Sequence, residues 1–337
     1  MRRVVLRLVV SLFFAVLCTA GAVLWLQVRY AAPGPHTDER VVIVERGTAV
    51  ADIARQLEGA GIVDSAFVFR AAGRVSGIDV RLKAGEYAIP AHASARDVAA
   101  ILASGQTVVR RLTVVEGTTT ADILRQVAAT DGLTGEVTTQ PDEGALLPET
   151  YHYSYGDSRD GLVRRMAEAM TATLGRLWSG RRDGLPLDNP RQALILASIV
   201  EKETGRSVER PLVAAVFFNR LGKGMRLQSD PTVAYGIVAG GGALELPLNR
   251  AALQSASPYN TYMVNGLPPG PICNPGMAAI AATLQPSDTN HLYFVADGTG
   301  GHAFARTLQE HNRNVRAWRR LQTDSKGSGP TEPLPAP

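Results

Sequence analysis

Two glutamates stand at the end of the most apolar helix that the sequence predicts. Polar residues at 188–189 can cap this helix, Pro190 suits its first position, and the run 193–200 is apolar apart from one serine. Glu201 continues the apolar face at helical spacing, so we expect it to be buried. Loss of hydration raises the pKa of such a carboxyl, which suits a general acid working near neutral pH.

Glu203 follows two residues later and is predicted to point in another direction. Two helical residues are separated by about 200° around the axis, so the carboxylates do not face each other as those of many hydrolases do. A structural role for Glu201 stays open, because Lys202, Arg206 or Arg210 could pair with it near the helix end.

Polar and aromatic side chains gather in the irregular segments that follow. Segments 219–231 and 257–262 are rich in Asn, Gln, Asp or Tyr, and segment 266–276 is rich in Pro and Gly. Pro/Gly segments form rigid loops, and polar side chains on such loops can line a sugar groove. The same residue types also serve as turn formers and helix caps.

The sequence predicts neither a metal nor a cofactor. Cys18 and Cys273 stand in unrelated contexts, which gives no disulfide framework. His291 and His302 flank a predicted hairpin without a third ligand at suitable spacing. The glycine runs at 240–242 and 298–301 lack the strand–loop–helix context of phosphate loops.

An internal repeat precedes the apolar helix. Residues 47–57 align with residues 117–127, 70 positions on, and seven of the eleven positions are identical. Each copy follows an apolar strand-like run, at 41–44 and 112–115, and continues into an amphipathic helix that a threonine can cap. Two copies are too few for a solenoid, so we expect a small α+β module used twice.

Further elements complete an α+β reading. A strand is predicted within 82–90, a helix capped by Ser94, an amphipathic helix near 162–174, and a hairpin across 291–304. The predicted organisation is a cytoplasmic stub and transmembrane anchor at 1–30, a linker at 31–39, an α+β module at 40–110, a mixed α+β domain at 111–321, and a disordered tail at 322–337.

The N-terminus predicts a membrane anchor. Three arginines at positions 2, 3 and 7 precede an uncharged run over residues 8–28. A helix of that length spans roughly 30 Å, the thickness of a bilayer core, and the arginines favour a cytoplasmic N-terminus. The rival reading is a signal peptide cleaved at Ala20-Gly21-Ala22, but the apolar run continues past that site.

Charge gives little support to nucleic-acid binding. The chain carries 35 Lys and Arg against 31 Asp and Glu, a net charge of +4, and 45% of its residues are hydrophobic. The excess lies mainly in the five arginines of segment 306–320. A solvated helix face is the plain reading of that segment, and contact with anionic lipid or cell-wall polymer is the sharper one.

A series of motifs in a fixed order resembles the YceG-like (MltG) endolytic murein transglycosylases over roughly residues 40–320. These motifs occupy 197–204, 209–210, 216–221, 224–236, 257–262, 266–272 and 292–298. The resemblance implies a LysM-like first module and cleavage of MurNAc–GlcNAc β-1,4 bonds inside nascent glycan strands. That cleavage leaves 1,6-anhydro-MurNAc ends and terminates strand elongation.

The resemblance also implies the site residues. It assigns the catalytic glutamate to Glu201, and groove-lining roles to Glu203, Asn219, Gln228, Asp230, Tyr235, Asn260 and Tyr262. It implies peptidoglycan strands as substrate, peptidoglycan synthases as partners, and a location on the periplasmic side of the inner membrane. The family's single-carboxylate mechanism agrees with one isolated, desolvated Glu201.

Two alternatives remain open from the sequence. A non-catalytic cell-wall-binding scaffold would use Glu201 structurally. An ordinary glycan hydrolase would pair Glu201 with Asp230 or Glu149 and produce reducing MurNAc ends. The glycine-rich stretch 240–242 departs from the family pattern, as does Glu149, where the family often has Asp.

Overall fold

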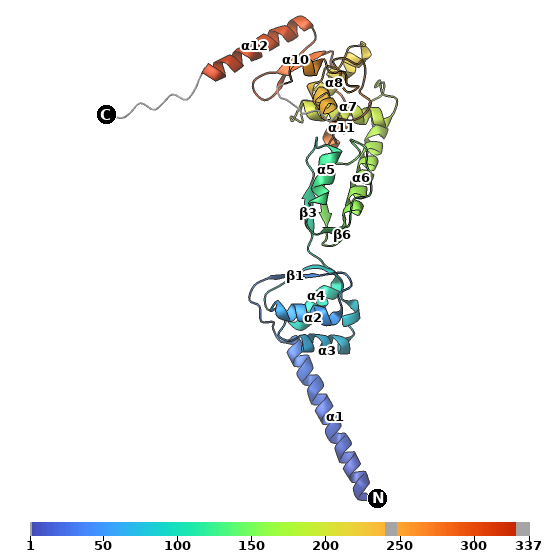
Figure 1. The fold of residues 1–337 in the computed structure, drawn as a ribbon, viewed down its shortest axis with the longest axis vertical. Coiled ribbons are helices and arrows are strands. Elements are labelled where there is room, and N and C mark those ends of the chain that lie inside the picture. Colours follow the sequence, from blue (N-terminus) through green and yellow to red (C-terminus); the bar gives the residue numbers. More distant parts are fainter. Residues whose placement is uncertain (1, 240–247, 328–337) are drawn as a thin grey trace, which may run out of the picture. The chain divides into compact units, whose positions relative to one another are not determined.

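The computed structural model describes residues 2–239 and 248–327, which divide into two compact units (Figure 1). Unit 1 comprises residues 1–112, 131–135 and 152–158, and unit 2 comprises residues 113–130, 136–151 and 159–337. The described strands form only two-stranded sheets, and helices supply most of the packing. The fold is therefore mixed α+β, as predicted, and the proposed domain boundaries stay predictions.

Unit 1 packs helices around a short antiparallel sheet. Its core contains the fully buried side chains of Leu57, Phe69, Tyr87 and Leu102. Its elements are α1 (Arg2–Ala31), β1 (Arg40–Val44), α2 (Val50–Gly59), α3 (Ala66–Ser76), the 3-10 turn η1 (Asp79–Arg81), β2 (Gly85–Ile89), α4 (Ala95–Ser104), β4 (Leu133–Thr134) and β6 (Asp157–Ser158). β1 pairs antiparallel with β2, and β4 pairs parallel with β6.

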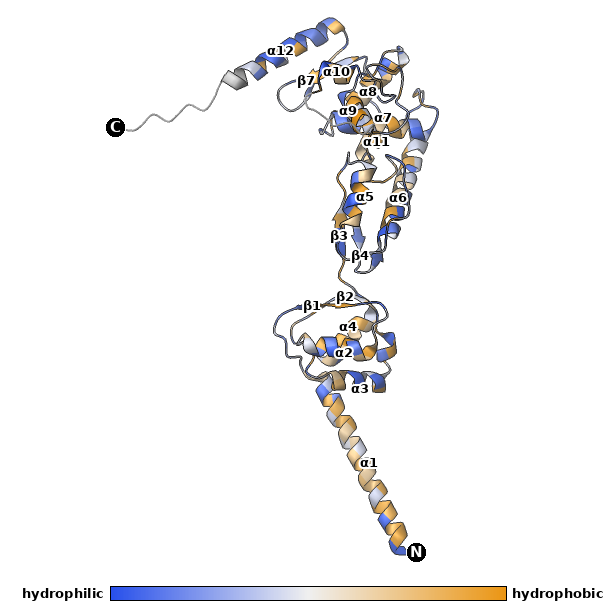
Figure 2. Cartoon of the chain, viewed as in Figure 1, coloured by the Kyte–Doolittle hydropathy of each residue, from blue (hydrophilic) through white to orange (hydrophobic). Residues whose placement is uncertain are grey.

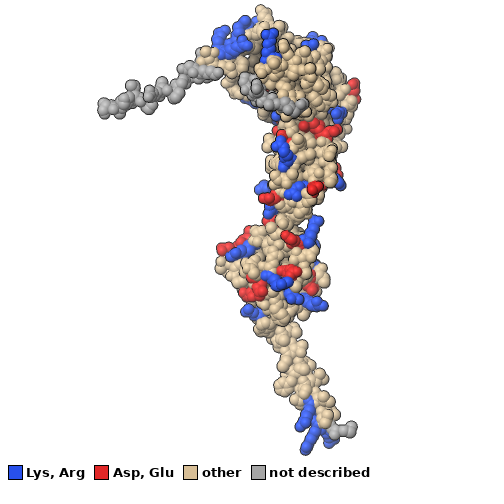
Figure 3. Space-filling view, in the orientation of Figure 1, with Lys and Arg blue, Asp and Glu red and all other residues tan. Residues whose placement is uncertain are grey.

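Helix α1 is long and apolar enough to cross a membrane. None of its most apolar stretch is buried in the protein. Figure 2 shows that α1 is apolar along most of its length. Figure 3 shows cationic side chains at its N-terminal end and an uncharged surface beyond them. Only the last turns pack on unit 1, where Tyr30 is buried.

Unit 2 packs its helices around α7. The contacts of α7 (Pro190–Glu203) are with α6 (Arg159–Ser179), α8 (Arg210–Gly222), α9 (Asp230–Ala239) and α11 (Met277–Leu284). The other elements are α5 (Thr120–Ala128), α10 (Arg250–Leu253), the antiparallel hairpin β7 (Tyr293–Ala296) and β8 (His302–Ala305), and α12 (Leu308–Gly327). β3 (Arg110–Thr113) and β5 (Thr150–Tyr153), which pair with each other, each have residues in both units.

The repeat predicted from the sequence is a repeat in structure. Gly47 and Gly117 occupy matching turns at φ +84° and +80°, a region that glycine adopts without strain. Gln56 donates to the carbonyl of Ile43 at 2.7 Å, and Gln126 donates to the carbonyl of Thr113 at 2.9 Å. Both copies therefore dock the helix on the preceding strand through the same glutamine.

The hairpin and the predicted starts of α4 and α7 are confirmed. Of the two threonine caps expected for the repeat, Thr119 caps α5, but the cap of α2 is wrong, because Ala49 stands at the matching position and has no side-chain acceptor. Asn189 caps α7 by accepting from the backbone N–H of Gln192, and Ser94 forms a capping box with Asp97 at α4. Helix α12 continues to Gly327, into the segment for which the sequence predicts a disordered tail. Residues 328–337 of that tail and the glycine run 240–242 lie outside the described residues.

Candidate active site

Helix α7 delivers Glu201 into the packed interior of unit 2. Every residue from Ala193 to Val200 is buried, because α6, α8, α9 and α11 cover the helix. Glu201 follows in the last turn, and its side chain is only 5% exposed. The sequence pattern placed this carboxyl correctly at the end of a buried helix.

Both carboxyl oxygens of Glu201 have partners. Oε1 accepts from Nη2 of Arg210 at 2.8 Å, and Oε2 accepts from the backbone N–H of Gly276 at 2.9 Å. Burial nevertheless raises the pKa of Glu201, and the charge of Arg210 and the Gly276 hydrogen bond oppose that rise. The carboxyl is thus desolvated and held in place at the same time.

The sequence reading missed a second carboxylate at this site. Glu116 lies in the turn between β3 and α5, and its Oε2 is 3.2 Å from Nη2 of Arg210. One guanidinium nitrogen therefore contacts both Glu116 and Glu201. The available signal was the internal repeat, since the position that is Arg46 in the first copy is Glu116 in the second.

Glu203 has a separate environment, as the helical spacing predicts. It accepts a short hydrogen bond from the hydroxyl of Ser229, which precedes α9. Burial raises the pKa of Glu203 to about 7, and the neighbouring charge of Asp230 adds to the rise. Glu203 is therefore a second carboxyl that can hold a proton near neutral pH.

A pocket of about 720 Å³ lies beside the C-terminal end of α7. Its polar lining includes Glu143, Lys202, Asp230 and Tyr235, and the rest is largely apolar. The Tyr235 hydroxyl donates to Oε2 of Glu143 at 3.4 Å, and the Tyr235 ring meets that of Tyr259 edge-on at 4.9 Å. Of the predicted groove residues, the pocket thus contains Asp230 and Tyr235.

Two more predicted groove residues lie near Asp230 or on the surface beside it. The Tyr262 hydroxyl donates to Oδ1 of Asp230 at 2.6 Å, and burial raises the pKa of Tyr262. Gln228 is exposed at φ +52°, and its backbone N–H donates to Thr261. A non-glycine residue in that conformation is uncommon and marks a backbone fixed by its neighbours.

The two predicted asparagines donate to the backbone of loops. Asn219 donates from Nδ2 to the carbonyls of Thr289 and His291, at 2.7 and 3.0 Å. Asn260 is fully buried, and its Nδ2 donates to the carbonyls of Leu253 and Ser255. Their Nδ2 groups thus bond to the backbone of loops, and groove-lining by either residue stays a prediction.

Asn274 is a further residue for which the sequence gave no role beyond a turn. It is fully buried, and its Oδ1 accepts from the backbone N–H of Leu146 at 2.8 Å. Its Nδ2 donates to Thr118 and Thr120, both at 3.0 Å, and to Oε1 of Glu143 at 3.3 Å. One side chain thus joins the segment before Gly276 to the turn that carries Glu116.

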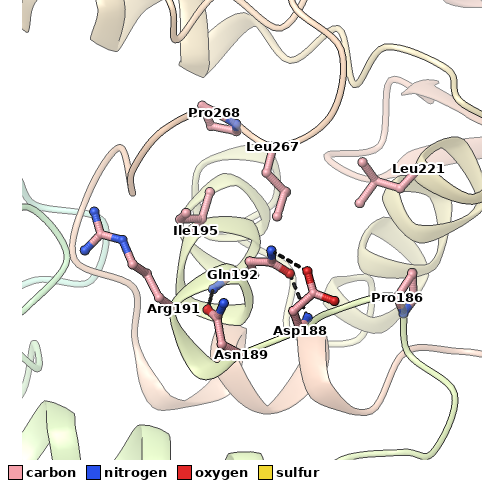
Figure 4. A pocket seen from close by; sticks show the side chains of 9 residues that line it. All are labelled: Pro186, Asp188, Asn189, Arg191, Gln192, Ile195, Leu221, Leu267 and Pro268. Atoms are coloured by element: carbon pink, nitrogen blue, oxygen red, sulfur yellow. Dashed lines mark hydrogen bonds between the residues drawn. The ribbon is translucent and has the colours of Figure 1, made fainter.

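A second pocket, of about 560 Å³, lies at the opposite end of α7 from Glu201 (Figure 4). In Figure 4 the side chain of Gln192 bonds to that of Asp188, and Oδ1 of Asn189 accepts from the backbone N–H of Gln192 at the helix start. Arg191 and the loop residues Leu267 and Pro268 complete the wall. Its polar groups are occupied with capping the helix, so it is distinct from the Glu201 site.

The described residues offer no ready metal centre. Within residues 2–239 and 248–327, no group of three or more His, Cys, Asp or Glu is arranged to hold a metal ion. His302 instead pairs through Nδ1 with Oε2 of Glu209 at 2.7 Å. Asp230, one of the two carboxylates considered as a hydrolytic partner for Glu201, is bonded to Tyr262.

The fold and site define an α+β protein with a desolvated carboxyl at the end of a buried helix, a site suited to acid–base chemistry. The chain matches the model of the YceG-like family over residues 42–317, and it belongs to that family.

Relatives support the same assignment. The chain is 38% identical over 174 residues to an endolytic murein transglycosylase of Bacillus subtilis (strain 168), covering 51% of this chain and 47% of that protein. It is 30% identical over 316 residues to an endolytic murein transglycosylase of Streptococcus pneumoniae (strain D39), covering 81% and 57%. The chain therefore spans about half the length of these relatives.

A solved structure agrees with the fold. The crystal structure of a YceG-like protein from Listeria monocytogenes superposes with a TM-score of 0.52 at 29% identity, over 82% of this chain and 98% of that one. The likeness covers most of the two units and supports their α+β architecture.

Proposed function

We propose that this protein is a membrane-anchored endolytic lytic transglycosylase of peptidoglycan. The observation that carries the proposal is the carboxyl of Glu201, buried at the end of α7 beside a pocket and held by Arg210 and Gly276. Membership of the YceG-like family and two relatives named endolytic murein transglycosylase support it.

The proposed reaction uses Glu201 twice. As an acid it gives its proton to the oxygen of a MurNAc–GlcNAc β-1,4 bond, and the C1–O bond breaks. The resulting carboxylate takes the proton of the sugar's own 6-hydroxyl, whose oxygen bonds to C1 and closes a 1,6-anhydro ring. Glu201 ends protonated and no water is consumed, so a second carboxylate that activates water is not needed.

We further propose that Asp230, Tyr235, Tyr262 and Gln228 contact the glycan. Asp230 and Tyr235 line the pocket beside α7, and Tyr262 bonds to Asp230. Glu203, Asn219 and Asn260 bond within the protein, so we assign them to shaping the groove.

The rest of the chain serves placement in this proposal. Helix α1 would anchor the protein in the inner membrane with its arginines in the cytoplasm and the two units outside. Unit 1 would act as a LysM-like module toward glycan. Peptidoglycan synthases, which produce the nascent strands, would be the partners.

The test digests nascent, uncross-linked peptidoglycan with the full chain in detergent and identifies new ends by mass spectrometry. We expect 1,6-anhydro-MurNAc ends from the wild type, none from Glu201→Gln, and wild-type yields from Glu168→Gln, a control at an exposed glutamate of α6. Hydrated reducing ends would indicate a hydrolase. No ends from either protein, on substrate that a known lytic enzyme cuts, would indicate a scaffold.

A further inference from the structure

We propose that Glu116 is a positioning residue for Glu201: by sharing Arg210, it prevents the guanidinium from holding Glu201 permanently as a carboxylate. This inference rests on the proposed function, in which Glu201 must carry a proton to begin the reaction. Glu116 lies outside α7, and the pattern of apolar residues that predicts the burial of Glu201 gives no sign of it.

The geometry makes the two carboxylates compete for one donor. Nη2 of Arg210 is 2.8 Å from Oε1 of Glu201 and 3.2 Å from Oε2 of Glu116. The Arg210 side chain is 9% exposed, so its charge is poorly hydrated and depends on these two partners. Paired with Glu201 alone, a buried guanidinium would strongly favour the ionised carboxylate and disable it as an acid.

Two glycines determine where Glu116 lies. Gly117 follows it at φ +80°, which fixes the turn that presents the side chain. Gly276, whose N–H donates to Glu201, has an ordinary φ of −72°, yet a β-carbon there would overlap the Glu116 carboxylate. The absent side chain at Gly276 therefore serves close approach by Glu116 rather than backbone conformation.

The charges facing Glu201 come from several elements. Arg210 on α8 favours the carboxylate, and Glu116 from the turn before α5 opposes it. Lys202 follows Glu201 in α7, and its Nζ donates to the carbonyl of Gly117 at 3.4 Å. Cys273 is buried nearby, and burial raises the pKa of its thiol, so it stays neutral. Glu143 lies further along the pocket, bonded to Tyr235 and Asn274.

The sharing suits both halves of the proposed reaction. With Glu116 balancing Arg210, Glu201 can hold the proton that it gives to the glycosidic oxygen. Once the proton has left, Arg210 and the N–H of Gly276 stabilise the new carboxylate until it accepts the proton of the 6-hydroxyl. Glu116 touches neither the proton nor the sugar in this scheme, so it acts only through Arg210.

The experiment measures kcat/KM between pH 4 and 9 for the full chain in detergent, comparing wild type with Glu116→Gln. Removing the negative charge leaves Arg210 to Glu201 alone, so the basic limb of the profile should move to lower pH. We expect activity at pH 7 to fall on the order of tenfold, and activity at pH 5 to change by about twofold or less. Glu116→Asp, which keeps the charge but shortens its reach, should give an intermediate shift and serves if Glu116→Gln fails to fold.

The matched control is Arg46→Gln, at the equivalent turn of the first repeat, where we expect no change. A second readout needs no activity: the carboxyl carbons of ¹³C-labelled glutamates are titrated by NMR, and the Glu201 signal is identified by its loss in Glu201→Gln. Glu201 should titrate at lower pH in Glu116→Gln than in the wild type.

Two results would overturn the role of Glu116. One is a uniform loss of activity at every pH, which marks a merely structural ion pair. The other is an unchanged Glu201 titration. If the wild type makes no anhydro ends, the proposed function fails, but the NMR titration still decides whether Glu116 governs the protonation of Glu201.

Discussion

Replacing Asn274 with alanine should destabilise unit 2 more than any exposed substitution. The side chain is fully buried and bonds to the N–H of Leu146, the carbonyl of Thr118, the hydroxyl of Thr120 and the carboxyl of Glu143. These groups come from two separate stretches of the chain, 118–120 and 143–146, and Asn274 itself stands in a third. No alanine atom can replace the amide, so the N–H of Leu146 loses a buried acceptor.

The magnitude follows from the number of bonds lost. A buried hydrogen bond contributes about 1 kcal/mol net, and a buried group left without a partner costs about 1–3 kcal/mol. Losing the amide removes the two 3.0 Å bonds to Thr118 and Thr120, about 2 kcal/mol together, and leaves the Leu146 N–H unpaired, about 1–3 kcal/mol. We therefore expect a loss of about 3–5 kcal/mol. That is a large share of the stability of an ordinary domain, about 5–15 kcal/mol.

Urea unfolding followed by Trp178 fluorescence measures this loss. Trp178 lies on α6 in unit 2, and replacing Trp25 and Trp318 with phenylalanine removes the other tryptophan signals. The control is Asn312→Ala, at an exposed position of α12, which should change stability by about 0.5 kcal/mol or less. A loss below about 1 kcal/mol for Asn274→Ala would refute the view that this amide joins the site segments.

Three further outcomes are expected. Burial raises the pKa of Glu203 to about 7, above its ordinary 4.5, so the stability of the wild type should fall as pH rises from about 4.5 to 7. Glu203→Gln should remove that dependence, and at pH 8 it should be about 2 kcal/mol more stable than the wild type, as measured by urea midpoints. Hydrogen bonds from His302 lower the pKa of Glu209, although burial opposes them. The Glu209 carboxylate should therefore stabilise the fold above pH 4.5, its ordinary pKa, and this contribution should be lost as the pH falls. Thermal melts at pH 7 and pH 3 should show Glu209→Gln to be less stable than the wild type only at pH 7. Deleting residues 2–28 should move the protein from the membrane to the soluble fraction on centrifugation, and full retention in the membrane would contradict anchoring by α1.

Local signals predicted the elements well because each has a local physical cause. Asn189 and Pro190 mark the start of α7, and the apolar run behind them requires burial on almost every face. The repeated Gly-Thr turn with its later glutamine predicts a strand–turn–helix unit, and both copies form it. The end of α12 departs from prediction because Ser and Gly near the chain end suggested an irregular tail, whereas the helix continues to Gly327.

The site was predictable only where one element defines it. The burial of Glu201 could be predicted because it follows from the periodicity of α7 alone. Asn219 and Asn260 carry the residue types of a sugar groove, but their amides bond to backbone carbonyls of loops that the sequence could not place. Composition cannot separate these two uses of asparagine, since both need the same donors and acceptors.

The place of Glu116 beside Glu201 depends on contacts between residues distant in the sequence, which local patterns do not predict. The residue stands 85 positions before Glu201, in a turn whose first copy carries an arginine, and nothing in its own neighbourhood suggests an acid–base role. Its position at the site depends on Arg210 reaching both carboxylates and on Gly276 leaving space for the side chain. The repeat explains why this turn exists, while Glu116, which stands where the first copy is preceded by Arg46, explains what the second turn can do. Comparing repeats for the positions where they differ, rather than where they agree, is therefore the way to find such residues.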